Sequence, residues 1–164
     1  MDEPTSGLDT LVRRRFLESM IDVAALGRTV LLSSHQIPEV ERVADHVAII
    51  NQGRVLVSAR LDDLKQQIER WVISFSSDTL SIPNFDGQIL SHEGQNRKRQ
   101  QLLILNPGSD ALWQLRDHPG IAEVEIHTPS LEEIFVGFIK AGPRVTQTPP
   151  AVAHWRPSLG ESAS

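Results

Sequence analysis

Several features are missing from this 164-residue sequence, and each absence narrows the classes of protein that it can encode. It contains no cysteine, which excludes disulfides and a thiol catalyst. No stretch approaches the roughly 18 apolar residues that a membrane-spanning helix needs. The start of the sequence is acidic and has no apolar h-region, so it predicts no signal peptide. We therefore expect any membrane attachment to come through another chain.

The sequence also lacks an excess of positive charge. Its 16 basic and 21 acidic residues give a net charge of -5, so nothing favours nucleic acid or an anionic membrane as a partner. Two basic clusters, residues 13–15 and 97–99, are more typical of a solvated helix face or a turn than of a binding patch. The apolar fraction of 40% is ordinary for a globular chain with room for one domain or two small ones.

The first 70 residues alternate between helical and strand-like patterns. Residues 10–26 predict an amphipathic helix that Asp9 caps and Gly27 ends, with apolar positions at Val12, Phe16, Met20 and Val23, widened by Leu17, Ile21 and Ala24. The short run 30–32 suits a strand covered on both faces, as in a parallel sheet. A short helix from Pro38 to about residue 44, a hairpin of strands 47–50 and 54–58 about a turn at 51–53, and a helix over 61–68 follow. This order predicts the last part of an α/β sandwich.

The character of the sequence changes near residue 70. Strands are predicted at 71–75, 88–92, 102–105 and 122–127, with a polar stretch at 93–101, and helices at 110–118 and 131–139. These elements indicate a small α+β domain, for which a ferredoxin-like arrangement is one option. Proline, alanine, serine and threonine dominate from residue 142, which predicts a disordered tail. We therefore divide the chain into residues 1–69, 70–141 and 142–164.

Two groups of polar residues could carry chemistry. Asp2 and Glu3 are adjacent carboxylates that could hold a metal ion and polarise a water beside a nucleotide phosphate. For such a pair alone, the plainer interpretation is an acidic segment that precedes a helix. His35 follows the predicted strand at 30–32. A lone histidine there is usually structural or exposed. If the sheet is parallel, however, strand ends meet at one edge and His35 returns to the neighbourhood of Glu3.

Residues 1 to about 65 resemble one family closely. The string from Met1 to Asp9 resembles the Walker B and D-loop segment of ATP-binding cassette (ABC) transporter ATPases, and His35 stands where that family has its switch histidine. The resemblance implies that Asp2 holds Mg²⁺, Glu3 is the general base and His35 contacts the γ-phosphate of ATP. It further implies that Ser6, Gly7 and Asp9 form the D-loop, which communicates across an ATPase dimer.

Two later segments extend the resemblance. Residues 45–54 are similar to the family's final strand and hairpin, and residues 128–135 are similar to the C-terminal signature of ATPase subunits that pair with ABC-2-type permeases. The second segment also has a plain structural interpretation, in which Ser130 caps a helix and its apolar residues pack. Three family motifs are absent: the P-loop G-x-x-x-x-G-K-S/T, the glutamine loop and the signature motif. Thr10 replaces a common proline, and residues 59–60 replace a glycine-containing turn.

We therefore expect an α/β chain with a truncated P-loop NTPase-like sheet and a small C-terminal α+β domain. The resemblance implies the C-terminal portion of an ATP-binding subunit of an ABC-2-type exporter, which uses ATP and Mg²⁺. It also implies a transmembrane permease subunit and a second ATPase subunit as partners, and a peripheral cytoplasmic location at the membrane. Without a P-loop, this polypeptide is expected not to hydrolyse ATP alone. An incorrectly assigned start at an internal Met and a broken gene would both give such a sequence. The alternatives are a non-enzymatic regulatory or interaction module and a split ATPase completed by a separate N-terminal polypeptide.

Overall fold

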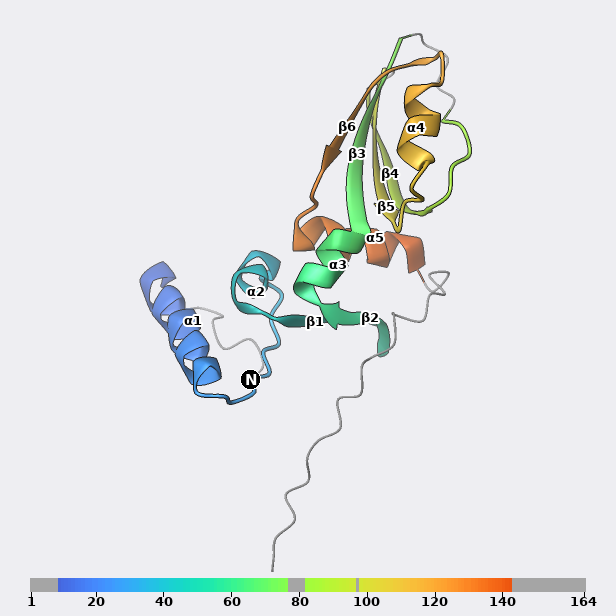
Figure 1. Ribbon diagram of the computed structural model, residues 1–164. Helices are drawn as coiled ribbons and strands as arrows, with labels where there is room; N and C mark the ends of the chain where they lie inside the picture. Colours follow the sequence, from blue (N-terminus) through green and yellow to red (C-terminus); the bar gives the residue numbers. More distant parts are fainter. Residues whose placement is uncertain (1–8, 77–81, 97, 143–164) are drawn as a thin grey trace, which may run out of the picture.

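The computed structural model describes residues 9–76, 82–96 and 98–142. Asp2, Glu3, Ser6 and Gly7, and the tail predicted to be disordered, lie outside this range. The described residues form a mixed α/β structure with two antiparallel sheets and five helices (Figure 1). The elements are α1 (Thr10–Ala25), α2 (Ile37–Val43), β1 (His46–Asn51), β2 (Arg54–Arg60), α3 (Leu61–Gln67), β3 (Ile68–Phe75), β4 (Gln88–Asn96), β5 (Arg99–Leu105), α4 (Ala111–Arg116), β6 (Ile121–His127) and α5 (Leu131–Ala141).

The small sheet is the predicted hairpin of β1 and β2. Its turn consists of Gln52 and Gly53, with φ of 49° and 74°. Positive φ at both central residues matches the twist of the flanking strands in a two-residue hairpin. Alternate residues Val47 and Ile49 point into the core, as expected for a sheet with one buried face.

The larger sheet has the order β4-β5-β3-β6 with all neighbours antiparallel. The polar stretch at residues 93–101 separates two predicted strands, but its residues 93–96 and 99–101 extend β4 and β5. Register shifts between Ile89 and Ser91 and between Gly94 and Asn96 accommodate this polar sequence. Bulges of this kind are common in edge strands, and β4 is an edge of the sheet.

Helices cover this sheet on opposite faces. One face carries Trp71, Ile73 and Leu102 and packs beneath α4 through Leu115. The other face packs beneath α5 through Ile134. A ferredoxin-like unit follows the order β-α-β-β-α-β. The ferredoxin-like option is therefore corrected here, because residues 82–87 before β4 are not helical and α5 follows the last strand.

The core beneath α5 draws on residues from both halves of the chain. It combines β1, β2 and α3, through side chains such as Val57 and Leu64, with β4, β5 and α5, through side chains such as Leu103 and Phe138. The domain boundary predicted at residues 69 and 70 falls inside β3. The boundary stays a prediction, and one apolar cluster contains residues from both sides of it.

The strand predicted at residues 30–32 does not form. Residues 28–32 have no regular structure, Ser33 makes an isolated bridge, and the segment joins neither of the two sheets of the described residues. The side chain of Leu31 is 83% exposed. A strand requires neighbours that accept and donate its backbone hydrogen bonds, and both sheets present here are built from later segments.

Helix α1 forms where the sequence predicts it, but its apolar stripe is only partly buried. Leu17 and Met20 are 7% exposed, whereas Val12 is 50% and Ile21 48% exposed. Figure 1 shows α1 at the opposite end of the molecule from the larger sheet, with α2 between them. The local sequence thus determines the helix, while the core lies elsewhere.

Candidate functional site

Asp9 and His35 are the two predicted site residues that lie within the described part of the chain. Asp9 is the N-cap of α1, and its carboxylate accepts a hydrogen bond from the backbone N–H of Leu11 at 3.2 Å. This contact satisfies one of the N–H groups that a helix start leaves without an intrahelical partner. The predicted capping role of Asp9 is confirmed, while its predicted D-loop role stays a prediction.

His35 is held in a short turn immediately before α2. The hydroxyl of Ser34 accepts a hydrogen bond from the backbone N–H of Gln36 at 3.0 Å, which closes the turn around the histidine. Gln36 is the N-cap of α2, and Pro38 follows in the first turn of that helix. The side chain of His35 is exposed. Because the turn leads directly into α2, the backbone position of His35 is linked to that of the helix.

Helix α2 is held in place although none of its residues is fully buried. Ile37, Val40 and Ala44 pack partly buried against the core beneath α5. Glu41 adds two polar contacts: one carboxylate oxygen pairs with the ammonium of Lys65 on α3, and the other accepts from the backbone N–H of Leu131 at 3.2 Å. Sequence reasoning missed Glu41, because a contact between residues 90 positions apart leaves no local signal.

The start of α5 is the most fully hydrogen-bonded helix end in this region. Ser130 and Glu133 form a capping box, in which the Ser130 hydroxyl accepts from the Glu133 N–H and the Glu133 carboxylate accepts from the Ser130 N–H. The guanidinium of Arg70 on β3 also binds Glu133, at 2.7 Å. Burial raises the pKa of the Glu133 carboxyl, but hydrogen bonds from Ser130 and Arg70 outweigh it and leave the pKa below its ordinary value.

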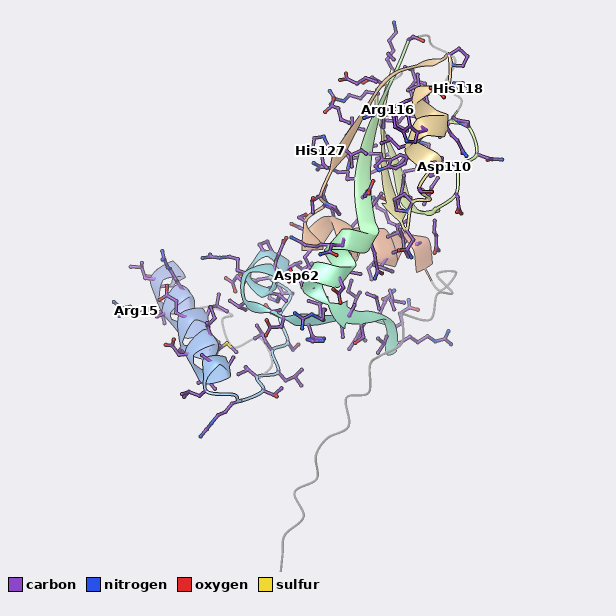
Figure 2. All side chains as sticks on the ribbon, viewed as in Figure 1. Arg15, Asp62, Asp110, Arg116, His118 and His127 are labelled. Atoms are coloured by element: carbon purple, nitrogen blue, oxygen red, sulfur yellow. The ribbon has the colours of Figure 1, made fainter. Side chains whose placement is uncertain are left out.

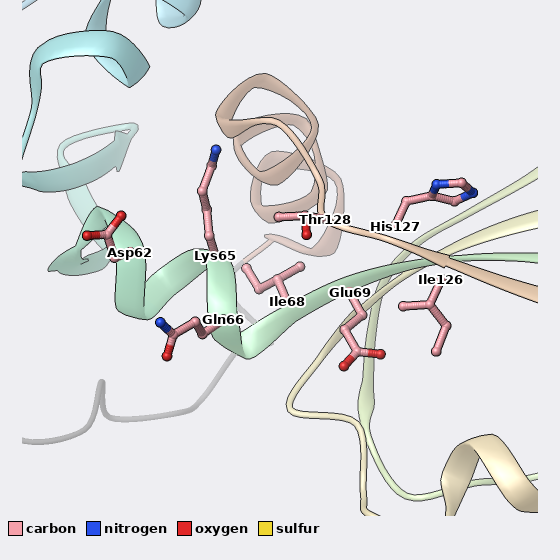
Figure 3. Close-up of a pocket in the computed structure, with 8 residues that line it drawn as sticks. All are labelled: Asp62, Lys65, Gln66, Ile68, Glu69, Ile126, His127 and Thr128. Carbon is pink, nitrogen blue, oxygen red and sulfur yellow. The ribbon is translucent and has the colours of Figure 1, made fainter.

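A pocket of about 440 Å³ lies beside this junction (Figure 3). Its lining comes from α3, the start of β3, the end of β6 and the following Thr128. Figure 2 shows Asp62 on α3 and His127 on β6. Several of its polar groups are bound to neighbours: Lys65 to Glu41, and the Glu69 carboxylate to the indole N–H of Trp71 at 2.5 Å. The lining carries charged groups of both signs, Asp62 and Glu69 beside Lys65, so it favours no one class of ligand.

Within the two basic clusters, the described side chains of Arg14 and Arg15 are exposed on α1, whereas Arg99 is partly buried. Arg14 pairs with Glu18 one helical turn away at 2.9 Å, and Arg15 is exposed on α1 (Figure 2). Arg99 pairs with Glu125 on β6 at 3.0 Å. Within the described ranges, no group of three histidine, aspartate or glutamate side chains could hold a metal ion, and no helix is long and apolar enough to cross a membrane.

Comparison with known proteins identifies the class to which these features point. No family model matches the chain. The bacitracin transport ATP-binding protein BcrA of Bacillus licheniformis is 30% identical over 161 residues, which cover 87% of this chain and 48% of that protein. A Nod factor export ATP-binding protein I of Cupriavidus pinatubonensis is 38% identical over 138 residues, covering 83% of this chain and 42% of the relative.

A third relative matches over a shorter length with higher identity. An ABC transporter ATP-binding protein of Nostoc is 44% identical over 64 residues, or 39% of this chain and 19% of the relative. The homologues of this chain are ATP-binding proteins of ABC transporters. The chain spans about half the length of the relatives that it matches over most of its own length.

Proposed function

We propose that this chain is the C-terminal portion of the ATP-binding subunit of an ABC exporter. In this proposal Asp2 and Glu3 lie beside ATP and Mg²⁺, and His35 lies at the γ-phosphate. The observation that carries the proposal is the homology to transport ATP-binding proteins over 83–87% of the chain. The capped start of α1 at Asp9 and the exposed histidine turn before α2 are compatible with it.

In this proposal each residue has one task. The Glu3 carboxylate accepts a proton from the attacking water, Asp2 holds Mg²⁺, and His35 contacts the γ-phosphate. Ser6, Gly7 and Asp9 form the loop that faces a second ATPase subunit. The partner that moves the substrate is a transmembrane permease subunit, which would keep the complex at the cytoplasmic face of a membrane. A P-loop must then come from further sequence of the same protein or from a separate N-terminal polypeptide.

The first test asks whether the 164-residue polypeptide binds nucleotide. Isothermal titration with Mg·ATP is expected to give no saturable binding below millimolar nucleotide, because the sequence has no P-loop to supply backbone N–H groups and a lysine. Saturable one-to-one binding at micromolar ATP would contradict this expectation. It would also show that the fragment carries a nucleotide site that the resemblance does not predict.

The second test restores the P-loop in a chimaera that joins the N-terminal half of a homologous ATPase to this chain. Glu3→Gln keeps the size of the side chain but cannot accept the proton, so kcat should fall by about 10²–10⁴ while ATP binding is retained. His35→Ala should also lower kcat sharply. Glu132→Gln, an exposed charge change on α5, is the matched control and should change nothing. Normal turnover in both variants would remove Glu3 and His35 from the site.

A further inference from the structure

A glutamate on α2 forms a polar link between the helix that follows the His35 turn and the start of α5. Glu41 lies on α2, six residues after His35, and its two carboxylate oxygens contact different elements. One pairs with Lys65 on α3, and the other accepts from Leu131 N–H at the start of α5. Glu41 therefore joins three helices, of which α5 follows the last strand of the larger sheet.

The contact with Glu41 gives the start of α5 a hydrogen-bond acceptor and gives the Glu41 carboxylate a donor. The first N–H groups of a helix lack intrahelical acceptors and carry a partial positive charge, which a carboxylate stabilises. The capping box satisfies the N–H groups of Ser130 and Glu133 but not that of Leu131, which Glu41 takes. The side chain of Glu41 is only 22% exposed, so solvent screens these contacts less than those of a surface pair.

The contact matters for α2 because that helix is short and has no fully buried residue. It has seven residues, none fully buried, and its N-cap Gln36 makes no side-chain capping hydrogen bond. A helix this short is not stable by itself. The partly buried contacts of Ile37, Val40 and Ala44 with the core and the polar contacts of Glu41 help to fix its position and that of the turn before it.

We propose that Glu41 is a positioning residue that couples α5 and the C-terminal sheet to the turn carrying His35. The catalytic meaning of this coupling rests on the proposed function, in which His35 contacts the γ-phosphate. The structural coupling between α5 and α2 does not depend on the proposed function. A change in the packing of the C-terminal sheet would then be transmitted to the histidine in part through this carboxylate.

The test compares three variants of the 164-residue chain by hydrogen exchange and by the ring resonances of His35. Glu41→Ala removes both contacts and should raise exchange of the α2 amides about tenfold, the size expected for a hydrogen bond to a charged group, and shift the His35 resonances. Glu41→Gln keeps an oxygen for Leu131 N–H but loses the charge facing Lys65, so its effect should be smaller. Glu132→Gln removes an exposed charge from the same helix end and should have no effect.

Two results would overturn the proposal. The first is an unchanged α2 exchange rate and unchanged His35 resonances in Glu41→Ala. The second is an equal rise in exchange across α2, β3 and β5, since that would mean that Glu41 affects only overall stability. If Glu41→Ala unfolds the chain, the same comparison is made with Glu41→Gln, which retains the backbone contact.

The catalytic consequence is measured separately in the P-loop chimaera. Glu41→Ala should lower kcat several-fold with KM for ATP unchanged, because α2 positions His35 but binds no nucleotide itself. If His35→Ala leaves turnover normal, the proposed function fails, while the exchange and resonance data still decide whether Glu41 couples the two regions. The two failures are therefore distinguishable.

Discussion

Replacing Ile134 by alanine would test whether the core beneath α5 joins the two halves of the chain. Ile134 is 0% exposed and belongs to the cluster that contains β1 and β2 residues such as Val57 as well as β5 residues such as Leu103. Large-to-small substitutions of this kind cost about 2–5 kcal/mol, through lost burial and the cavity left behind. Small domains are stable by only about 5–15 kcal/mol, so the loss should be easily measured.

Urea unfolding gives the change in free energy, and hydrogen exchange shows where it acts. We expect Ile134→Ala to raise exchange in the β1–β2 hairpin and in β4 and β5 together, because one cluster supports both. Leu115→Ala is the matched control: Leu115 is also 0% exposed but lies in the cluster beneath α4. Its local effect should centre on β3, α4 and β6. An Ile134→Ala variant with unchanged protection of β1 and β2 would refute the shared core and support a boundary near residue 70.

Three further predictions concern local contacts. Gly137→Ala should lower Tm despite the better helix propensity of alanine, because its Cβ would lie 2.5 Å from Leu103 Cδ2, whereas Gly94→Ala, which meets nothing within 4 Å, should change little. Glu133 has a lowered pKa, so its stabilising contribution is complete above the ordinary glutamate pKa and is lost as pH falls through the lower folded-state value; the difference in urea stability between wild type and Glu133→Gln should shrink in that range. Asp9→Ala should cost about 1 kcal/mol of α1 stability, seen as faster exchange of the α1 amides but not of β3.

Where local chemistry determines the structure, the sequence predicted it well. The Gln52-Gly53 turn, the cap at Asp9, the proline in the first turn of α2 and the serine cap of α5 all appear as expected. Each depends on residues within about four positions of one another, so a single sequence carries the whole signal. Mixed α/β architecture follows from the same local patterns.

The errors arise where structure depends on distant residues. The run at residues 30–32 has the composition of a buried strand, but a strand also needs neighbours, and composition cannot supply them. The polar residues 93–101 look irregular alone, yet they pair because β3 gives β5 a partner along its whole length. Glu41 resembles any glutamate on a short helix until α5 is placed against it.

Several of the exposed apolar side chains lie in the first part of the chain. Leu11, Val12, Ile21 and Leu31 are all at least 48% exposed, although they lie on or beside a well-formed helix. By contrast, the two clusters about the larger sheet contain side chains with almost no exposure. An apolar surface of this kind is typical of one that packs against another element or chain. Under the proposed function, the missing cover is the P-loop-bearing part of the ATPase. In that arrangement the exposed apolar side chains of α1 pack against that part, and α2 lies between α1 and the larger sheet (Figure 1).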